Sequence, residues 1–149
     1  MKLPIWVKEI AGAWTFYLVL PQWKWPTPSY KRIARFAPLI GLFIGGIQAI
    51  LWCLLSYFDW PTSANALITI TLGFWITGGL HLDGLIDTFD GLAAGKERCL
   101  DAMEDSRIGA SGVQSLILII LLQIAALLKL GNLALLALPI ANFWGRCSS

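Results

Sequence analysis

The sequence predicts an all-α protein, a multi-pass bundle of membrane helices in which about four spans follow an N-terminal helix at the membrane interface. Hydrophobic residues make up 57% of its 149 residues and charged residues only 13%, whereas soluble domains contain about 45–50% and about 25%. The mean hydropathy is +0.69. This composition excludes a disordered chain, a basic nucleic-acid-binding domain and most soluble enzymes. We therefore interpret residues 1–149 as a single membrane domain.

The first apolar run, from Ile10 to Leu20, ends at Pro21 and is too short to cross a bilayer. Four tryptophans lie within this run or close to it: Trp6, Trp14, Trp23 and Trp25. Tryptophan is enriched where the membrane meets water. We therefore expect an interfacial helix here rather than a span.

Four uncharged runs are interpreted as membrane spans: residues 36–58, 64–82, 112–128 and 133–144. The first exceeds the roughly 20 residues that are needed to cross about 30 Å of hydrocarbon. Gly41, Gly45 and Gly46 lie near its start, and small residues four apart predict the close approach of another helix. The fourth run is followed by no polar tail, so we expect the chain to be a piece of a longer protein.

Basic residues predict the orientation of these spans. With four crossings, only Lys129 falls on one side of the membrane. Eight basic residues fall on the other side: Lys24, Lys31, Arg32, Arg35, Lys96, Arg98, Arg107 and Arg146. Because short loops rich in lysine and arginine stay in the cytoplasm, we expect the segment from His81 to Gly112 to face the cytoplasm.

Seven of the nine acidic residues lie between Asp83 and Asp105. Asp83, Asp87 and Asp90 have the spacing i, i+4, i+7, which places them within about 60° on one face of a helix. Stacked like charges weaken a helix, and a bound cation would compensate them. Hard oxygen donors without a His–Cys cluster favour Mg²⁺ or Mn²⁺. The spacing therefore predicts a platform for a metal ion and phosphate at the cytoplasmic end of a membrane helix.

The residues around these aspartates have alternative interpretations. His81, the only histidine, is either a structural residue or a candidate general base. Four glycines suggest close approach of the backbone to a ligand or to a neighbouring helix: Gly78, Gly79, Gly84 and Gly91. Asp105 is either a further metal ligand or a partner that orients Arg107. The guanidinium of Arg107 either pairs with phosphate or anchors the third span at the interface.

Two segments carry a resemblance to a known family. Residues 78–91, GGLHLDGLIDTFDG, followed by residues 103–112, MEDSRIGASG, resemble the signature of the cobalamin synthase family, whose other name is adenosylcobinamide-GDP ribazoletransferase. The resemblance implies that the adenosylcobinamide-phosphate moiety of adenosylcobinamide-GDP is transferred to α-ribazole or to its 5′-phosphate. GMP would be released in this final assembly of the cobalamin nucleotide loop. It also implies a bacterial inner-membrane enzyme whose cytoplasmic catalytic segment is residues 78–112.

The resemblance further implies a role for each site residue. Mg²⁺ would be held by Asp83, Asp87 and Asp90, and one of these carboxylates or His81 would accept a hydroxyl proton. The substrates would contact four further residues: Gly79, Gly84, Asp105 and Arg107. The number of metal ions, the identity of the base and the oligomeric state stay open at this point.

Two alternatives belong to other functional classes. A CDP-alcohol phosphotransferase also stacks aspartates on membrane helices, with a pattern similar to DGxxAR. Here Asp83 and Gly84 are followed by Leu-Ile-Asp-Thr, without Ala-Arg. A non-enzymatic carrier of divalent cations would use the acidic helix end to bind its cargo, and it predicts metal flux without release of a nucleotide.

Overall fold

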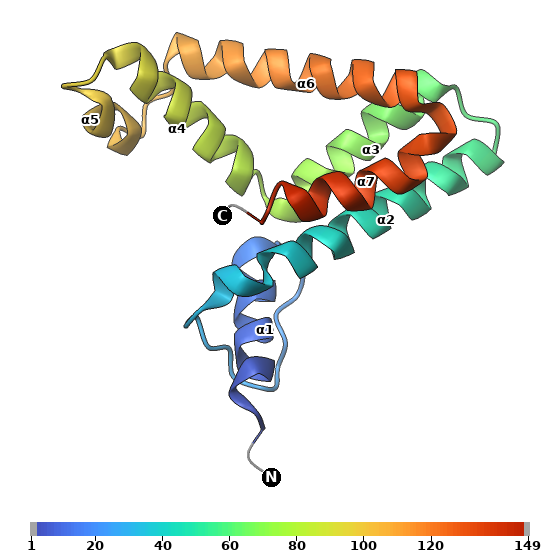
Figure 1. Ribbon diagram of the computed structural model, residues 1–149, viewed down its shortest axis with the longest axis horizontal. Coiled ribbons are helices and arrows are strands. Elements are labelled where there is room, and N and C mark those ends of the chain that lie inside the picture. Colours follow the sequence, from blue (N-terminus) through green and yellow to red (C-terminus); the bar gives the residue numbers. More distant parts are fainter. Residues whose placement is uncertain (1–2, 148–149) are drawn as a thin grey trace.

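The computed structural model describes residues 3–147, and every regular element in that part of the chain is helical (Figure 1). The all-α fold class is therefore confirmed. Seven α-helices and two short 3₁₀ turns follow one another within these residues: α1 (Ile5–Tyr17), η1 (Ile33–Phe36), α2 (Ala37–Tyr57), α3 (Thr62–Thr77), α4 (Leu80–Ala94), α5 (Cys99–Glu104), α6 (Ala110–Leu130), η2 (Gly131–Leu133) and α7 (Ala134–Trp144).

Among the described residues, two helical segments are long and apolar enough to cross a membrane. Ile33–Tyr57 has 25 residues with a mean hydropathy of 2.1, and Ala110–Trp144 has 35 residues with a mean hydropathy of 2.3. Helices α3 and α4 meet at an angle of 90°. If they form one broken span, the number of candidate spans rises to three. The predicted number of four was therefore approximate. Helix α7 has only 11 residues and extends about 17 Å, which is too short for a separate span.

The junction between α3 and α4 changes the second predicted span, residues 64–82. Helix α3 ends at Thr77, and Gly78 and Gly79 both adopt left-handed backbone conformations, with φ of 60° and 79°. Glycine tolerates this region without a steric penalty. The chain therefore turns sharply before His81, and α4 starts as a separate helix with the aspartates on it.

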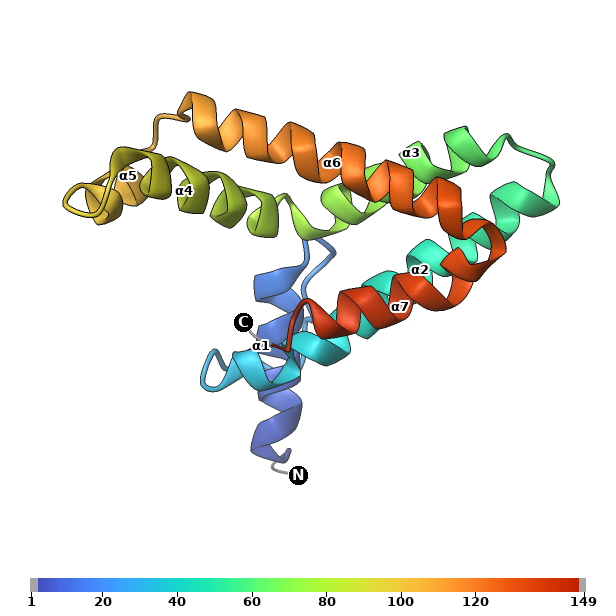
Figure 2. The same ribbon diagram turned by 45° about the horizontal axis from the view of Figure 1, so that its top comes forward.

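Helices α2 and α7 lie side by side, and glycines allow their close approach (Figures 1 and 2). A Cβ atom at Gly41 would collide with the carbonyl of Asn142, and one at Gly45 would lie 2.5 Å from the Cα of Pro139. A Cβ at Gly46 would meet nothing within 4 Å. The predicted close helix contact is thus confirmed for the two glycines that are four residues apart.

Helix α1 points away from the long helices, and it packs against η1 and α2 (Figure 1). It begins five residues before the apolar run that predicted an interfacial helix and therefore contains Glu9. The Glu9 side chain is almost completely buried and forms an ion pair of 2.5 Å with Arg35. This pairing offsets the cost of removing the carboxylate from water.

The outer surfaces of the long helices are apolar. In the most apolar window of Ala110–Trp144, only 11% of the residues are buried within the protein. Large exposed aliphatic side chains follow α6: Ile117, Leu118, Leu121, Leu122 and Leu128. Because soluble monomers rarely expose contiguous apolar patches of this kind, these surfaces are suited to lipid.

Candidate active site

The three aspartates all lie on α4, as the helical spacing predicted. Asp83 is in its first turn, and the backbone N–H groups of Leu82 and Asp83 both donate to the carbonyl of Gly79, at 2.8 and 2.9 Å. The helix therefore begins directly at the glycine turn. An acidic residue in a first turn interacts favourably with the positive end of the helix dipole.

Asp83 and Asp87 keep their carboxylates available for a ligand. Asp83 is exposed and Asp87 is half-buried. Within residues 3–147, neither side chain forms a hydrogen bond or an ion pair with another residue. Two like charges one turn apart on a helix repel each other. This arrangement therefore favours the binding of a cation from solution.

Asp90 has a different environment, which the sequence did not reveal. Its Oδ2 accepts a hydrogen bond from the backbone N–H of Gly109, and its Oδ1 accepts one from Gly112, both at 2.7 Å. Gly109 is the N-cap residue of α6 and provides no capping side chain. Asp90 thus satisfies two donors that a helix N-terminus leaves unpaired, and it joins the two motif segments to each other.

The glycines of these motifs fall into two groups. A Cβ on Gly109 or Gly112 would overlap the Asp90 carboxylate, so the absence of a side chain there makes the two hydrogen bonds geometrically accessible. A Cβ on Gly79 or Gly84 would meet nothing within 4 Å. The predicted close approach of a neighbouring helix is therefore not seen at Gly79 and Gly84 in the described chain, and their contact with a substrate stays a prediction. It is confirmed at Gly91, where a Cβ would lie 2.6 Å from Met103 of α5, and at Gly78 a Cβ would meet the side chain of Val19.

Asp105 orients Arg107. The Nη2 of Arg107 lies 2.7 Å from Oδ2 of Asp105, its Nε donates to the same carboxylate, and its backbone N–H donates to Oδ1 at 3.0 Å. The side-chain hydrogen bonds from Arg107, followed by the backbone hydrogen bond, lower the pKa of Asp105 from 3.8 to about 2. The Arg107 side chain is nevertheless 89% exposed, so a phosphate group has access to the guanidinium.

Metal binding by all three aspartates together stays a prediction. Among residues 3–147, no group of three or more histidine, cysteine, aspartate or glutamate side chains is arranged so that it could hold a metal ion. Asp90 is engaged by α6, whereas Asp83 and Asp87 share a face one turn apart. One or two carboxylates are enough for Mg²⁺ when phosphate oxygens complete its coordination, so these two fit such an ion.

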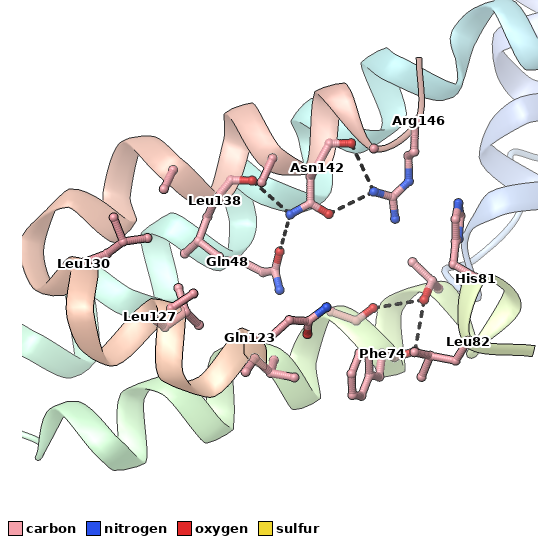
Figure 3. Close-up of a pocket in the computed structure, with 17 residues that line it drawn as sticks. Gln48, Phe74, His81, Leu82, Gln123, Leu127, Leu130, Leu138, Asn142 and Arg146 are labelled. Atoms are coloured by element: carbon pink, nitrogen blue, oxygen red, sulfur yellow. Dashed lines mark hydrogen bonds between the residues drawn. The ribbon is translucent and has the colours of Figure 1, made fainter. Parts of the chain in front are cut away.

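His81 lies at the start of α4 and lines an open cavity of about 390 Å³ between α2, α3, α6 and α7 (Figure 3). Its ring centroid is 6.3 Å from that of Tyr17. The side chain is exposed, which is compatible with a proton acceptor as well as with a structural residue. Its role as a base stays a prediction.

Polar residues of the same cavity were missed by the sequence analysis. Gln48 donates from Nε2 to the carbonyl of Thr69 at 2.9 Å and accepts at Oε1 from Nδ2 of Asn142 at 2.8 Å. Asn142 in turn accepts at Oδ1 from Nη1 of Arg146, at 2.9 Å. A carboxamide in the middle of an uncharged span was the signal that could have revealed this network, because polar side chains in membrane helices bond across helices.

The amino-acid sequence that forms this site is similar to those of known proteins. Residues 9–149 match a family described as cobalamin-5-phosphate synthase. The chain is 64% and 63% identical to proteins named adenosylcobinamide-GDP ribazoletransferase from Prochlorococcus marinus strains MIT 9303 and MIT 9313, over 99% of the chain and 57% of each relative. A protein of the same name from Trichormus variabilis is 43% identical over 79% of the chain and 47% of its own length. The chain thus spans about half the length of these relatives, and no solved structure matches it.

Proposed function

Because the chain belongs to the cobalamin-5-phosphate synthase family, we propose that it transfers the adenosylcobinamide-phosphate moiety of adenosylcobinamide-GDP to α-ribazole or its 5′-phosphate, releasing GMP. The names of its relatives contain both the donor and the ribazole acceptor. In this reaction a ribose hydroxyl attacks the phosphorus nearer the corrinoid. The bond from that phosphorus to the bridging oxygen breaks, and this oxygen leaves with GMP.

The observation that carries the proposal is the pair of hydrogen bonds by which Asp90 joins α4 to the start of α6. These bonds attach the end of the Arg107 loop to α4 at Asp90, which lies one helical turn after Asp87. A diphosphate needs anionic side chains that bind its counter-ion and a cation that offsets its own charge, and phosphoryl transfer depends mainly on positioning and on neutralised charge. The folded motif supplies both kinds of group on adjacent elements.

We propose Mg²⁺ as the cofactor, with Asp83 and Asp87 as its protein ligands. Their hard oxygen donors, which have no protein partner within residues 3–147, suit this ion. When bound, Mg²⁺ supplies charge neutralisation at the diphosphate oxygens. Asp90 then acts as a positioning residue for the Arg107 loop rather than as a metal ligand.

The chain's own residues have the following roles in this proposal. Arg107, oriented by Asp105, binds the transferred phosphoryl group or the GMP leaving group through its planar guanidinium. Asp83, Asp87 or His81 accepts the proton of the attacking hydroxyl. Gly79 and Gly84 are open on their solvent side and allow the substrate to approach the backbone of α4.

The proposal is tested by GMP release. The protein, expressed from its complete reading frame and purified in detergent with Mg²⁺, should release GMP from adenosylcobinamide-GDP when α-ribazole or its phosphate is added. A CDP-linked lipid donor should give no product, and liposomes that contain the protein should show no metal flux. Folded protein that releases no GMP under these conditions would contradict the proposal.

Asp87→Asn should lower the rate of GMP release by about 10²–10³-fold, because one charged group at the diphosphate is lost. Glu97→Gln is the matched control, since Glu97 is an exposed acid of the α4–α5 turn to which we assign no role. Its rate should equal that of the wild type. An unchanged rate in Asp87→Asn, with intact membrane insertion, would remove the metal platform from the mechanism.

We also propose that the protein is a multi-pass protein of the bacterial inner membrane and that α4, α5 and the Arg107 loop face the cytoplasm. The support is the three basic residues of this segment itself, Lys96, Arg98 and Arg107, and the proposed product GMP, which is a cytoplasmic nucleotide. A single cysteine introduced at exposed Ser106, in a cysteine-free background, should react with a membrane-impermeant maleimide in inverted vesicles. Labelling in intact spheroplasts instead would reverse the orientation.

A further inference from the structure

The cavity between α2, α3, α6 and α7 has two chemically different ends (Figure 3). Its volume of about 390 Å³ is near the lower limit of small-molecule pockets, which is about 300 Å³. A complete corrinoid is far too large for this space. A single nucleoside, with one bicyclic base and one sugar, has the appropriate size.

One end of the cavity is polar. Arg146 and His81 lie there together in Figure 3, and Asn142 lies next to them. The Arg146 side chain is held by its hydrogen bonds to Oδ1 and the carbonyl of Asn142, at 2.9 and 3.2 Å. A guanidinium is always charged in proteins and matches the geometry of phosphate. This end therefore suits an anionic group.

The opposite end is apolar. Leu127 and Leu130 lie at that end in Figure 3, with Phe74 along one wall. Between the two ends, aliphatic side chains such as Leu138 alternate with the carboxamides of Gln48 and Gln123. A guanine base placed against Leu127 and Leu130 would leave part of its hydrogen-bonding edge unpaired, which is costly. A dimethylbenzimidazole has no N–H donor and presents methyl groups, so it suits this end.

We propose that this cavity binds the ribazole acceptor in its 5′-phosphate form, with the dimethylbenzimidazole towards Leu127 and Leu130 and the phosphate towards Arg146. This inference rests on the proposed function. His81 belongs to the first turn of α4, the helix that carries Asp83 and Asp87, so the polar end of the cavity lies at the start of that helix. The ribose is thereby directed towards α4, where its hydroxyl meets the diphosphate of the donor.

Binding without turnover tests the proposal and separates it from the reaction itself. Calorimetry with the protein in nanodiscs would use three ligands: α-ribazole 5′-phosphate, α-ribazole and GMP. The phosphate form should bind, and removal of the phosphate should weaken binding about tenfold, because charge-assisted hydrogen bonds are lost. GMP should bind more weakly than either ribazole.

Two neighbouring substitutions on α6 provide the matched pair. Ala126 lines the cavity whereas the adjacent Ala125 does not, and both residues are exposed. Ala126→Phe should weaken binding of α-ribazole 5′-phosphate at least about tenfold by occupying the site, and Ala125→Phe should leave it unchanged. The proposal would be overturned if both variants bound α-ribazole 5′-phosphate equally well, if the wild type did not bind it, or if the wild type preferred GMP. GMP release that persists in Ala126→Phe would overturn the pocket while leaving the proposed reaction intact.

Discussion

Two regions of this protein are held together by different means. The bundle, formed by α2, α3 and α7, depends on the close approach of backbones at Gly41 and Gly45. The arm, formed by α4, α5 and the first turn of α6, extends to one side of the bundle (Figures 1 and 2). It depends on a carboxylate, that of Asp90, which binds two backbone N–H groups. The arm carries the candidate chemistry, and the bundle carries the cavity.

The difference follows from the surroundings of each region. Between apolar helices in lipid, there is no hydrophobic gain from association, so tight packing and interhelical hydrogen bonds provide the stability. The arm contains most of the acidic residues and few buried side chains, with only Ile86 and Gly91 buried on α4. A region of this kind is fixed by directed polar contacts, and it leaves other polar groups free for substrates.

The largest effect is expected in the bundle. Gly45→Val should lower the free energy of unfolding by about 3 kcal/mol or prevent folding, since the new side chain would overlap the backbone of α7. Gly46→Val is the control, because a Cβ there meets nothing within 4 Å. Thermal unfolding in detergent, followed by circular dichroism, would measure both. Equal melting temperatures for the two variants would show that close packing at Gly45 does not stabilise the bundle.

An intermediate effect is expected in the arm, and its size separates Asp90 from Asp83. Asp90→Asn should lower stability by about 1–3 kcal/mol, because one of the two backbone N–H groups loses its acceptor. Asp83→Asn should change stability by less than about 0.5 kcal/mol, because relief of the repulsion from Asp87 is offset by the loss of a negative charge at the helix N-terminus. Hydrogen exchange at the amides of Gly109 and Gly112 would report the loss directly. Unchanged exchange in Asp90→Asn would argue against its positioning role.

The smallest effect concerns the loop before α6. Because Arg107 lowers the pKa of Asp105 from 3.8 to about 2, their contact contributes its full stability above about pH 4 and loses it as the pH falls through 2. Carboxyl NMR should find the Asp105 midpoint near pH 2 in the wild type and at a higher pH in Arg107→Gln, where only the hydrogen bond from the backbone N–H remains. Since both side chains are accessible to solvent, global stability should hardly change. A midpoint that is the same in both proteins would contradict the orienting role of Asp105.

Asp90 shows the limit of periodicity as a guide to function. The spacing of Asp83, Asp87 and Asp90 correctly predicted that they lie on one helix. It could not show that the third carboxylate would contact Gly109 and Gly112, because those donors come from a helix 19 and 22 residues later in the chain. Contacts between distant segments depend on how the helices pack, which the local pattern does not contain.

The second predicted span and the missed cavity have the same explanation. Residues 64–82 are continuously apolar enough to predict a single helix, yet the two glycines at 78 and 79 bend the chain, and glycine alone does not specify a bend. Gln48 and Asn142 are 94 residues apart and meet only because α7 packs along α2. The ion pair between Glu9 and Arg35 likewise forms only because α1 packs against the segment that carries Arg35.

The amino-acid sequence by itself determined the class of the protein, its membrane environment, the helical face of the aspartates and the family resemblance, because these follow from composition, local periodicity and short motifs. The tertiary structure decided which aspartate binds the backbone of α6, where the chain bends before α4, and which polar residues surround the cavity. Those features arise from contacts between segments far apart in the chain, whose energies depend on helix packing rather than on neighbouring residues.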